Sequence, residues 1–410
     1  MTYTTNMTAA TRRQLENTVN QIAEAVMRKD DVTSGSLLAG KAGHALFYGH
    51  LYHCSGNESH FKQFSTMLNE CMVWVTEQPT NASLANGFAG LMWVIQHFIR
   101  IGLLEDEAGQ FLTDLDQHLQ VSLEADYINR NYDLLHGLVG KGLYLLERLP
   151  HPASAEVLKK LVDQLESLAV EGADILTWQD PSASSVNTYN LGMAHGVPSI
   201  ISFLAKVHRS GVTPKQTHVL LTKATSWLLQ QEKPVGYSRF PLAAGMEVQS
   251  RLGWCYGDLG PALALFHAAQ ALGRNDWRTQ ALDVARYASQ RTIENGNLSR
   301  HTLHGWLDTG FCHGTAGIAH IFNSFYQVSR SKEFKNSAQY WLKLSLPPLP
   351  ADEGIAGYVQ LSFDAERKSK PCLENTALLG GATGVGLVLL SFLQPQQPAW
   401  DGFFMTDIYS

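Results

Sequence analysis

The sequence predicts an all-α protein, an α/α toroid of seven helix hairpins with an inner ring and an outer ring of seven helices each. Three observations predict it: a glycine motif that recurs seven times, an apolar helical run after each motif, and amphipathic segments between successive motifs. A buried helix that alternates with a half-buried one requires one layer of helices inside another. We therefore expect a single domain over residues 1–410, although length alone suggests two or three.

The glycine motif marks the start of each expected inner helix. Most copies carry two glycines three residues apart, as in LAGKAG at 38–43 and CHGTAG at 312–317. The first glycines of the seven copies are Gly40, Gly87, Gly137, Gly196, Gly257, Gly314 and Gly381. They lie about 57 residues apart on average, which leaves room for two helices and two connections. Glycine at this point permits a positive φ or a close approach of neighbouring chain.

The segments between the motifs predict the outer helices. The first of them carries one apolar stripe at helical spacing, formed by Leu15, Val19, Ile22 and Val26. Thr11 and Gln14 have the spacing of a capping box at its start. After the motifs, runs such as HALFYGHLYHC at 44–54 are apolar over most of a helix surface. We expect one irregular excursion at 347–371, in which the alternation over 358–363 predicts a short strand.

Composition excludes several classes of protein. Hydrophobic residues make up 45% and charged residues only 17%, which indicates a large core. A net charge of −6 without a basic block argues against nucleic-acid binding. Residues 1–13 contain no apolar core, and no apolar run approaches the ~18 residues that span a bilayer. The five cysteines include no CxxC pair, which favours reduced thiols and a cytoplasmic location.

Three side chains beside the glycines have the chemistry of a zinc site. Cys255, Cys312 and His313 offer two thiolates and an imidazole, a ligand set that suits zinc and leaves a fourth position open. Because Cys312 and His313 are adjacent, both can reach one metal only in a turn, and the glycine motif supplies that turn. The alternative is that both cysteines are small buried hydrophobic residues.

The chain resembles the lanthionine synthetase C-like cyclases. The resemblance is carried by AHG at 194–196, WCYG at 254–257 and CHG at 312–314, in this order on the sevenfold glycine repeat. It covers essentially the whole chain and implies a toroid of fourteen helices. It also implies a single zinc ion per chain at the mouth of the toroid, held by Cys255, Cys312 and His313.

The resemblance implies four further site residues. His195 of AHG matches the active-site histidine of the family, and Asp133 of YDLLHG at 132–137 matches its acidic partner. Arg251 and Tyr256 match the remaining family positions. Histidine suits a general acid because its pKa lies near neutral pH, and a carboxylate beside it raises that pKa. Arginine and tyrosine suit a developing enolate, although both side chains also serve as ordinary packing and ion-pairing groups.

The function that follows is that of a zinc-dependent lanthionine cyclase in lanthipeptide (bacteriocin) biosynthesis. Such an enzyme adds cysteine thiolates to dehydroalanine or dehydrobutyrine within one dehydrated precursor peptide. Two alternatives stay open, a relative that adds glutathione or another thiol to dehydrated proteins, and a helical scaffold that binds peptides without catalysis. Glycoside hydrolases also use α/α barrels, but they need a pair of carboxylates. Only Asp133 and Asp258 accompany the cysteines and histidines of the motifs.

Partners follow from this chemistry. A dehydrated precursor peptide with a leader requires a separate dehydratase, and the resemblance implies an exporter as well. We expect a cytoplasmic protein that associates peripherally with the inner membrane face through such a complex, without a membrane span or a nucleic-acid partner.

Overall fold

The computed structural model describes residues 7–29, 31–105, 108–181, 188–300, 305–360 and 374–409. It divides into two compact units, which are described separately. The first unit comprises Met1–Pro79, Asn297–Gly402 and Tyr409–Ser410, and the second comprises Thr80–Gly296 and Phe403–Ile408. A single domain over 1–410 stays a prediction.

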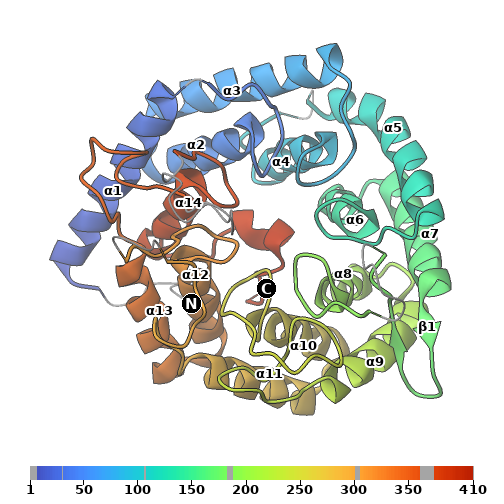
Figure 1. The fold of residues 1–410 in the computed structure, drawn as a ribbon. Helices are drawn as coiled ribbons and strands as arrows, with labels where there is room; N and C mark the ends of the chain where they lie inside the picture. The colour runs from blue at the N-terminus through green and yellow to red at the C-terminus, as the bar shows by residue number, and fades with distance from the viewer. Residues whose placement is uncertain are drawn as a thin grey trace, which may run out of the picture. The chain divides into compact units, whose positions relative to one another are not determined.

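The described residues of the first unit form six α-helices in two layers. They are α1 (Ala9–Arg28), α2 (Lys41–Ser55), α3 (Glu58–Glu77), α12 (Thr315–Ser329), α13 (Lys332–Leu344) and α14 (Ala382–Leu393). Within this unit α2, α12 and α14 lie inside α1, α3 and α13 (Figure 1). Each hairpin packs against itself, α2 on α3 and α12 on α13, while α14 contacts α1, α2 and α12. A 3-10 helix, η1 (Trp400–Phe404), follows α14 near the end of the chain.

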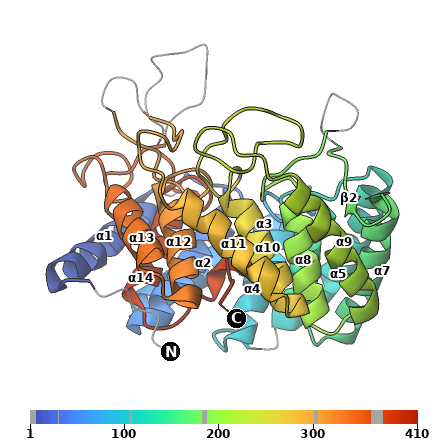
Figure 2. The ribbon, with the colours of Figure 1, turned by 90° about the horizontal axis from the view of Figure 1, so that it is seen from below.

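In the second unit, the part of the chain that the structure describes forms eight α-helices and a small β-hairpin. The helices are α4 (Phe88–Arg100), α5 (Ala108–Ile128), α6 (Leu138–Glu147), α7 (Pro152–Leu168), α8 (Val197–Arg209), α9 (Pro214–Gln230), α10 (Leu259–Leu272) and α11 (Asn275–Ala288). In this unit α4, α6, α8 and α10 form the inner layer and α5, α7, α9 and α11 the outer layer (Figure 1). The loops before α8 and α10 leave from the same end of these helices (Figure 2).

Two short strands that the sequence did not predict lie in the second unit. Strands β1 (Val170–Glu171) and β2 (Leu176–Thr177) pair antiparallel, with Val170 opposite Thr177. They follow α7, and Leu176 and Thr177 are buried while Val170 and Glu171 are exposed. The hairpin is therefore a small addition to a helical unit.

The predicted stripe of the first helix is confirmed, but its cap is not. Leu15, Val19, Ile22 and Val26 are 1%, 1%, 0% and 2% exposed. The helix begins earlier than expected, at Ala9, and Thr8 rather than Thr11 is its N-cap. The Thr8 hydroxyl oxygen accepts the backbone N–H of Thr11 at 3.1 Å, so Thr11 lies already inside the first turn.

The glycines start the inner helices as predicted, for one of the two expected reasons. Gly87 and Gly137 are N-caps with extended backbone, at φ −120° and −122°. A Cβ on Gly87 would lie 2.2 Å from the backbone oxygen of Asn81, so close approach of the chain requires glycine there. Only Gly257, of the seven first glycines, has a positive φ, +100°.

The excursion at 347–371 is only partly described. Its described residues contain one isolated antiparallel bridge, between Ile355 and Tyr358. The strand expected over 358–363 extends into residues 361–373, which lie outside the described residues, as does Cys372. None of the described helices combines the length and the apolar character needed to cross a bilayer.

Candidate functional site

A repeated turn leads into the inner helices. Six residues before the first glycine of each motif stand Ser34, Asn81, Asn131, Asn190, Arg251, Asp308 and Asn375. Asn81 illustrates the turn: its Oδ1 accepts the N–H of Ser83 at 2.9 Å, and its backbone oxygen accepts the N–H of Phe88 at 3.0 Å. Asparagine, aspartate and serine form such turns through a side-chain oxygen. Arg251 is the exception among the seven.

This column of residues is a signal that the sequence reasoning missed. It can be found by aligning the repeats on their glycines, because the same residue class recurs at the same offset. Two of the predicted site residues, Asp133 and Arg251, lie in or beside it, as does Asp308 near the predicted metal ligands. The chemistry of the chain therefore collects on the turns rather than on the helices.

In the second unit, the turn before α6 presents Asp133 to His195. Asp133 Oδ2 lies 2.6 Å from His195 Nδ1. The other carboxylate oxygen, Oδ1, accepts the backbone N–H groups of Leu135 at 2.7 Å and His136 at 2.8 Å. With Nδ1–H donating to Asp133, His195 keeps Nε2 for other partners. This hydrogen bond raises the pKa of His195, against the opposing effect of burial, and favours the protonated imidazole at neutral pH.

Buried polar contacts anchor this turn to the helices around it. Asn131 Nδ2 donates to Asp126 Oδ1 at 3.1 Å, and Lys141, only 2% exposed, forms an ion pair with the same aspartate. Asp126 belongs to α5 and Lys141 to α6. The turn that carries Asp133 is thus tied to two helices, because the Asp133 backbone N–H donates to Asn131 Oδ1 at 3.4 Å.

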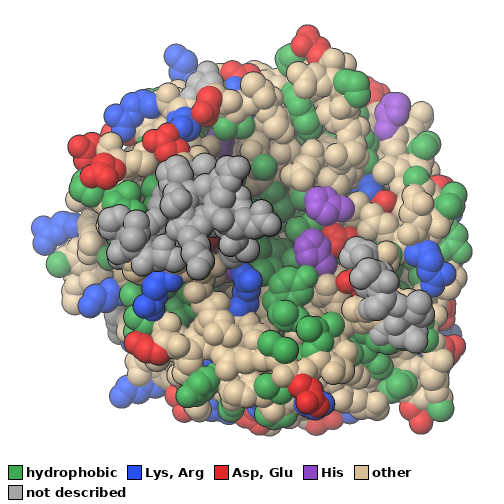
Figure 3. All heavy atoms as spheres, in the orientation of Figure 1, with side chains coloured by type: hydrophobic (Ala, Val, Ile, Leu, Met, Phe, Trp, Pro, Cys, Tyr) green, Lys and Arg blue, Asp and Glu red, His purple; other side chains and the backbone are tan. Residues whose placement is uncertain are grey.

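Tyr256 and Cys255 lie near His195 in the same unit. The ring centroids of Tyr256 and His195 are 6.5 Å apart. The backbone oxygen of Cys255 accepts the N–H of Ala194 at 3.5 Å, which ties the WCYG turn to the AHG turn. Cys255 is 7% exposed. The predicted residues Asp133, His195, Cys255 and Tyr256 are therefore brought together. In Figure 3, histidine side chains reach the surface over α6 and α8.

Arg251 stands half-buried on the loop before Cys255. Asp258, which follows the WCYG motif, accepts the backbone N–H groups of Arg239 and Phe240 at its Oδ1, each at 2.9 Å. Burial raises the pKa of Asp258 to about 6. Asp258 thus serves the loop structure, and a catalytic carboxylate pair with Asp133 finds no support here.

Cys312 and His313 belong to the first unit, on the turn before α12. His313 Nε2 lies 3.3 Å from Asp308 Oδ2, while Asp308 Oδ1 accepts the N–H of Gly310 at 2.8 Å. A carboxylate beside an imidazole nitrogen is a common arrangement at metal sites. Both Cys312 and His313 are partly exposed. The four described cysteines form no disulfide.

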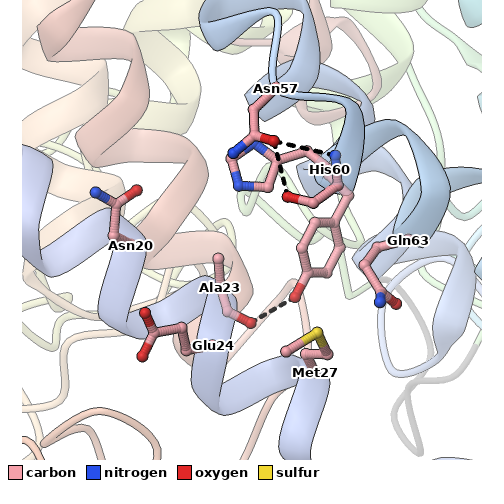
Figure 4. A pocket seen from close by; sticks show the side chains of 9 residues that line it. Asn20, Ala23, Glu24, Met27, Asn57, His60 and Gln63 are labelled. Carbon is pink, nitrogen blue, oxygen red and sulfur yellow. Dashed lines mark hydrogen bonds between the residues drawn. The ribbon is translucent and has the colours of Figure 1, made fainter.

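A separate pocket of about 380 Å³ lies in the first unit between α1 and the start of α3. Glu24, Met27 and His60 are among its lining residues (Figure 4). Tyr48 also lines it, and its hydroxyl donates to the backbone oxygen of Ala23 at 2.5 Å. None of the predicted site residues lines it.

Comparison with known proteins gives one family and several relatives. The family model described as lanthionine synthetase C-like protein matches residues 31–405. A glutathione S-transferase LANCL1 from Danio rerio is 23% identical over 380 residues, which cover 86% of this chain and 88% of the relative. The nisin biosynthesis protein NisC from Lactococcus lactis subsp. lactis is 22% identical over 284 residues, 62% of this chain and 64% of the relative.

The fold class is shown by a solved structure. The structure of nisin cyclase superposes with a TM-score of 0.74 at 18% identity and covers 98% of both chains. The all-α prediction of an α/α toroid is confirmed by this similarity.

Proposed function

Because the chain belongs to the lanthionine synthetase C-like family, we propose that it is an enzyme that closes lanthionine rings in a dehydrated peptide. The observation that carries the proposal is the Asp133–His195 pair beside Cys255. A histidine held as an acid by a carboxylate at 2.6 Å lies next to the turn that carries a buried thiol. Addition of a thiol to an activated alkene needs a group that helps to activate the substrate sulfur, here Cys255 as a metal ligand. It also needs an acid that supplies the proton, here His195.

We further propose that Cys255, Cys312 and His313 hold one zinc ion per chain. The fit rests on their donor chemistry, which is two thiols and an imidazole that lies 3.3 Å from the carboxylate of Asp308. When bound, zinc supplies a Lewis acid that lowers the pKa of a substrate thiol and favours its thiolate.

The residues of this chain then stabilise the negative charge that develops and deliver the proton. As the substrate sulfur bonds to the β-carbon, the π electrons of the dehydrated residue move to the neighbouring carbonyl and form an enolate. His195 delivers the proton that the α-carbon needs, and Asp133 stabilises the imidazolium beforehand. In this proposal Arg251 and Tyr256 stabilise the negative charge that develops on the enolate oxygen. The thiol proton leaves to solvent and one proton is returned, so the reaction is balanced.

A second candidate function is the addition of glutathione to dehydrated residues of proteins. The relative named glutathione S-transferase LANCL1 matches 86% of this chain, against 62% for NisC. The same acid and the same thiol chemistry serve both reactions, so the site does not separate them. The product does, because one reaction is intramolecular and the other is not. A scaffold without catalysis would bind the peptide but close no ring.

The proposed substrate determines the proposed setting. Dehydroalanine and dehydrobutyrine arise by loss of water from serine and threonine, so a dehydratase must act first. We place the reaction in the cytoplasm, at a complex of dehydratase and exporter at the inner membrane face, where cysteine thiols stay reduced.

The test combines metal content with ring closure. Purified protein is given a dehydrated peptide with cysteines, and thiols that remain are counted by alkylation and mass spectrometry, since ring closure leaves the mass unchanged. We expect about one zinc per chain by elemental analysis, with both zinc and ring closure lost in Cys312→Ala and kept in the control Cys54→Ala. Added glutathione that appears as adducts supports the second candidate. Ring closure that is unimpaired in a folded Cys312→Ala protein refutes the zinc mechanism.

A further inference from the structure

Asn190 lies beside the proposed active site and belongs to none of the motifs that predicted it. We infer that Asn190 is a positioning residue that fixes the direction of the Tyr256 hydroxyl, so that Tyr256 donates its proton toward the substrate. The inference rests on the proposed function and assigns separate tasks to Tyr256 and His195: the first donates a hydrogen bond to the enolate oxygen, and the second protonates the α-carbon.

The contacts of Asn190 determine which end of its amide faces Tyr256. Asn190 is 8% exposed, and its Oδ1 accepts the N–H of Gly192 at 2.8 Å. Because a backbone N–H can only donate, the oxygen end is assigned without ambiguity. The nitrogen end must therefore face the other way, where Nδ2 lies 3.3 Å from Tyr256 Oη and 3.2 Å from Asp180 Oδ2.

The amide nitrogen carries two hydrogens, and the two contacts use them both. One goes to the carboxylate of Asp180, which fixes the amide plane from the far side. The other goes to Tyr256 Oη, which must accept it. A tyrosine hydroxyl that accepts from Asn190 has its own hydrogen left to donate, and accepting one hydrogen bond strengthens the bond that it donates.

The position of Tyr256 indicates what its hydroxyl hydrogen binds, which is the enolate oxygen of the proposed reaction. Its ring lies 6.5 Å, centroid to centroid, from that of His195, so both side chains serve the same space. In the proposed reaction, negative charge develops on a carbonyl oxygen while a proton is added two bonds away. A neutral donor for the oxygen and a charged acid for the carbon match this demand.

The other repeats show that the turn alone does not require asparagine. Ser34 closes the corresponding turn with its hydroxyl, which accepts the N–H of Ser36 at 3.2 Å, and Asp308 closes another with its carboxylate. Serine at 190 would therefore keep the turn and remove only the donor to Tyr256. The same change at Asn81, whose Oδ1 accepts from Ser83 in the same unit, is the matched control.

The experiment measures kcat and KM for ring closure in wild type, Asn190→Ser, Asn81→Ser, Tyr256→Phe and the double variant of 190 and 256. Loss of one positioning hydrogen bond predicts a kcat about tenfold lower for Asn190→Ser, with KM changed less than about twofold. Asn81→Ser keeps the wild-type kcat. Tyr256→Phe loses at least as much, and the double variant loses no more than Tyr256→Phe, because the two residues act through one hydroxyl.

The outcomes are distinct. An active wild type with an unchanged kcat for Asn190→Ser, or losses that add up in the double variant, overturns the positioning role alone. A wild type that closes no ring overturns the proposed function and the positioning role with it. Should Asn190→Ser fail to fold, Asn190→Thr also has a hydroxyl that can accept the N–H of Gly192 and lacks the amide donor. We expect the same fall in kcat for that variant.

Discussion

Replacing Asp133 by asparagine tests the acid that the proposed reaction needs. The variant Asp133→Asn keeps an oxygen that can accept the N–H groups of Leu135 and His136, now at 2.7 and 2.8 Å from Oδ1. It removes the negative charge that lies 2.6 Å from His195 Nδ1. The turn is thus preserved, and the imidazole loses the partner that favours its protonated form.

The structure sets the expected size of the effect. A hydrogen bond between charged groups contributes about 2 kcal/mol, and its loss corresponds to a kcat about 30-fold lower. The amide nitrogen of the new asparagine would also face Nδ1 as a donor, which favours the wrong tautomer of the imidazole. Both effects act on proton delivery, so KM for the peptide should change little.

The pH dependence gives an independent measurement. In wild type the hydrogen bond and charge of Asp133 raise the pKa of His195 above its ordinary value near 6.5. The acid form therefore persists to higher pH, and kcat falls only as the pH passes the raised pKa. Without Asp133 the pKa of His195 loses the contribution that raises it most, so the basic limb of the profile moves to lower pH. The stabilising contribution of the pair, present at low pH and lost as pH rises through the raised pKa, disappears with it.

The assay is ring closure on a dehydrated peptide, followed by thiol alkylation from pH 5.5 to 9. The exposed aspartate Asp174, in the same unit, supplies the matched control Asp174→Asn. An Asp133→Asn protein with a kcat within about threefold of wild type and an unmoved basic limb would refute the role of the pair.

Two predictions concern stability. Asp258 has a pKa near 6 in the fold against 3.8 as the reference, so the folded state binds its proton more tightly and the charged carboxylate is unfavourable there. As the pH rises from 4.5 to 7.5, the free energy of unfolding of Asp258→Asn should therefore increase by about 2 kcal/mol relative to that of wild type, measured by urea unfolding. Parallel pH dependences of the two unfolding free energies would contradict this. Gly87→Ala places a Cβ 2.2 Å from the Asn81 oxygen and should cost about 1–3 kcal/mol. The control Gly109→Ala, whose Cβ meets nothing nearer than 3.7 Å, should be neutral or stabilising, and equal stability of the two variants would show that close approach does not require glycine at 87.

Local patterns predicted most of the fold. The first glycines mark the starts of the seven inner helices, as Gly137 does for α6. They are visible in the sequence because close approach of the chain at these points requires one particular residue type, glycine. The cap of α1 was misplaced by one turn, since Thr8 and Thr11 are both capable caps and only tertiary context chooses between them. The β1–β2 hairpin was missed because strands of two residues carry no periodic signal.

The candidate site was predictable where a motif names a chemical group. Asp133 and His195 belong to motifs, and the structure joins them at 2.6 Å. Aligning the repeats would identify Asn190 as a turn residue but not as a partner of Tyr256, and Asp180 resembles an ordinary loop residue. The contact of Asn190 with Tyr256, 66 residues further along the sequence, depends on the path of the chain rather than on any local pattern.

The repeated turn separates architecture from chemistry. In six of the seven copies the backbone oxygen of the turn residue accepts the N–H of the first residue of the inner helix. Asn190 accepts from Val197 at 3.0 Å in this way, and Asp308 accepts from Thr315 at 2.9 Å. Because both groups belong to the backbone, this hydrogen bond does not depend on the side chain. The side chain of the turn residue can therefore vary in each copy while the inner helix still begins at the same residue. In protein design, acidic, amide and hydroxyl side chains could therefore be exchanged among these turn positions without a change of the backbone.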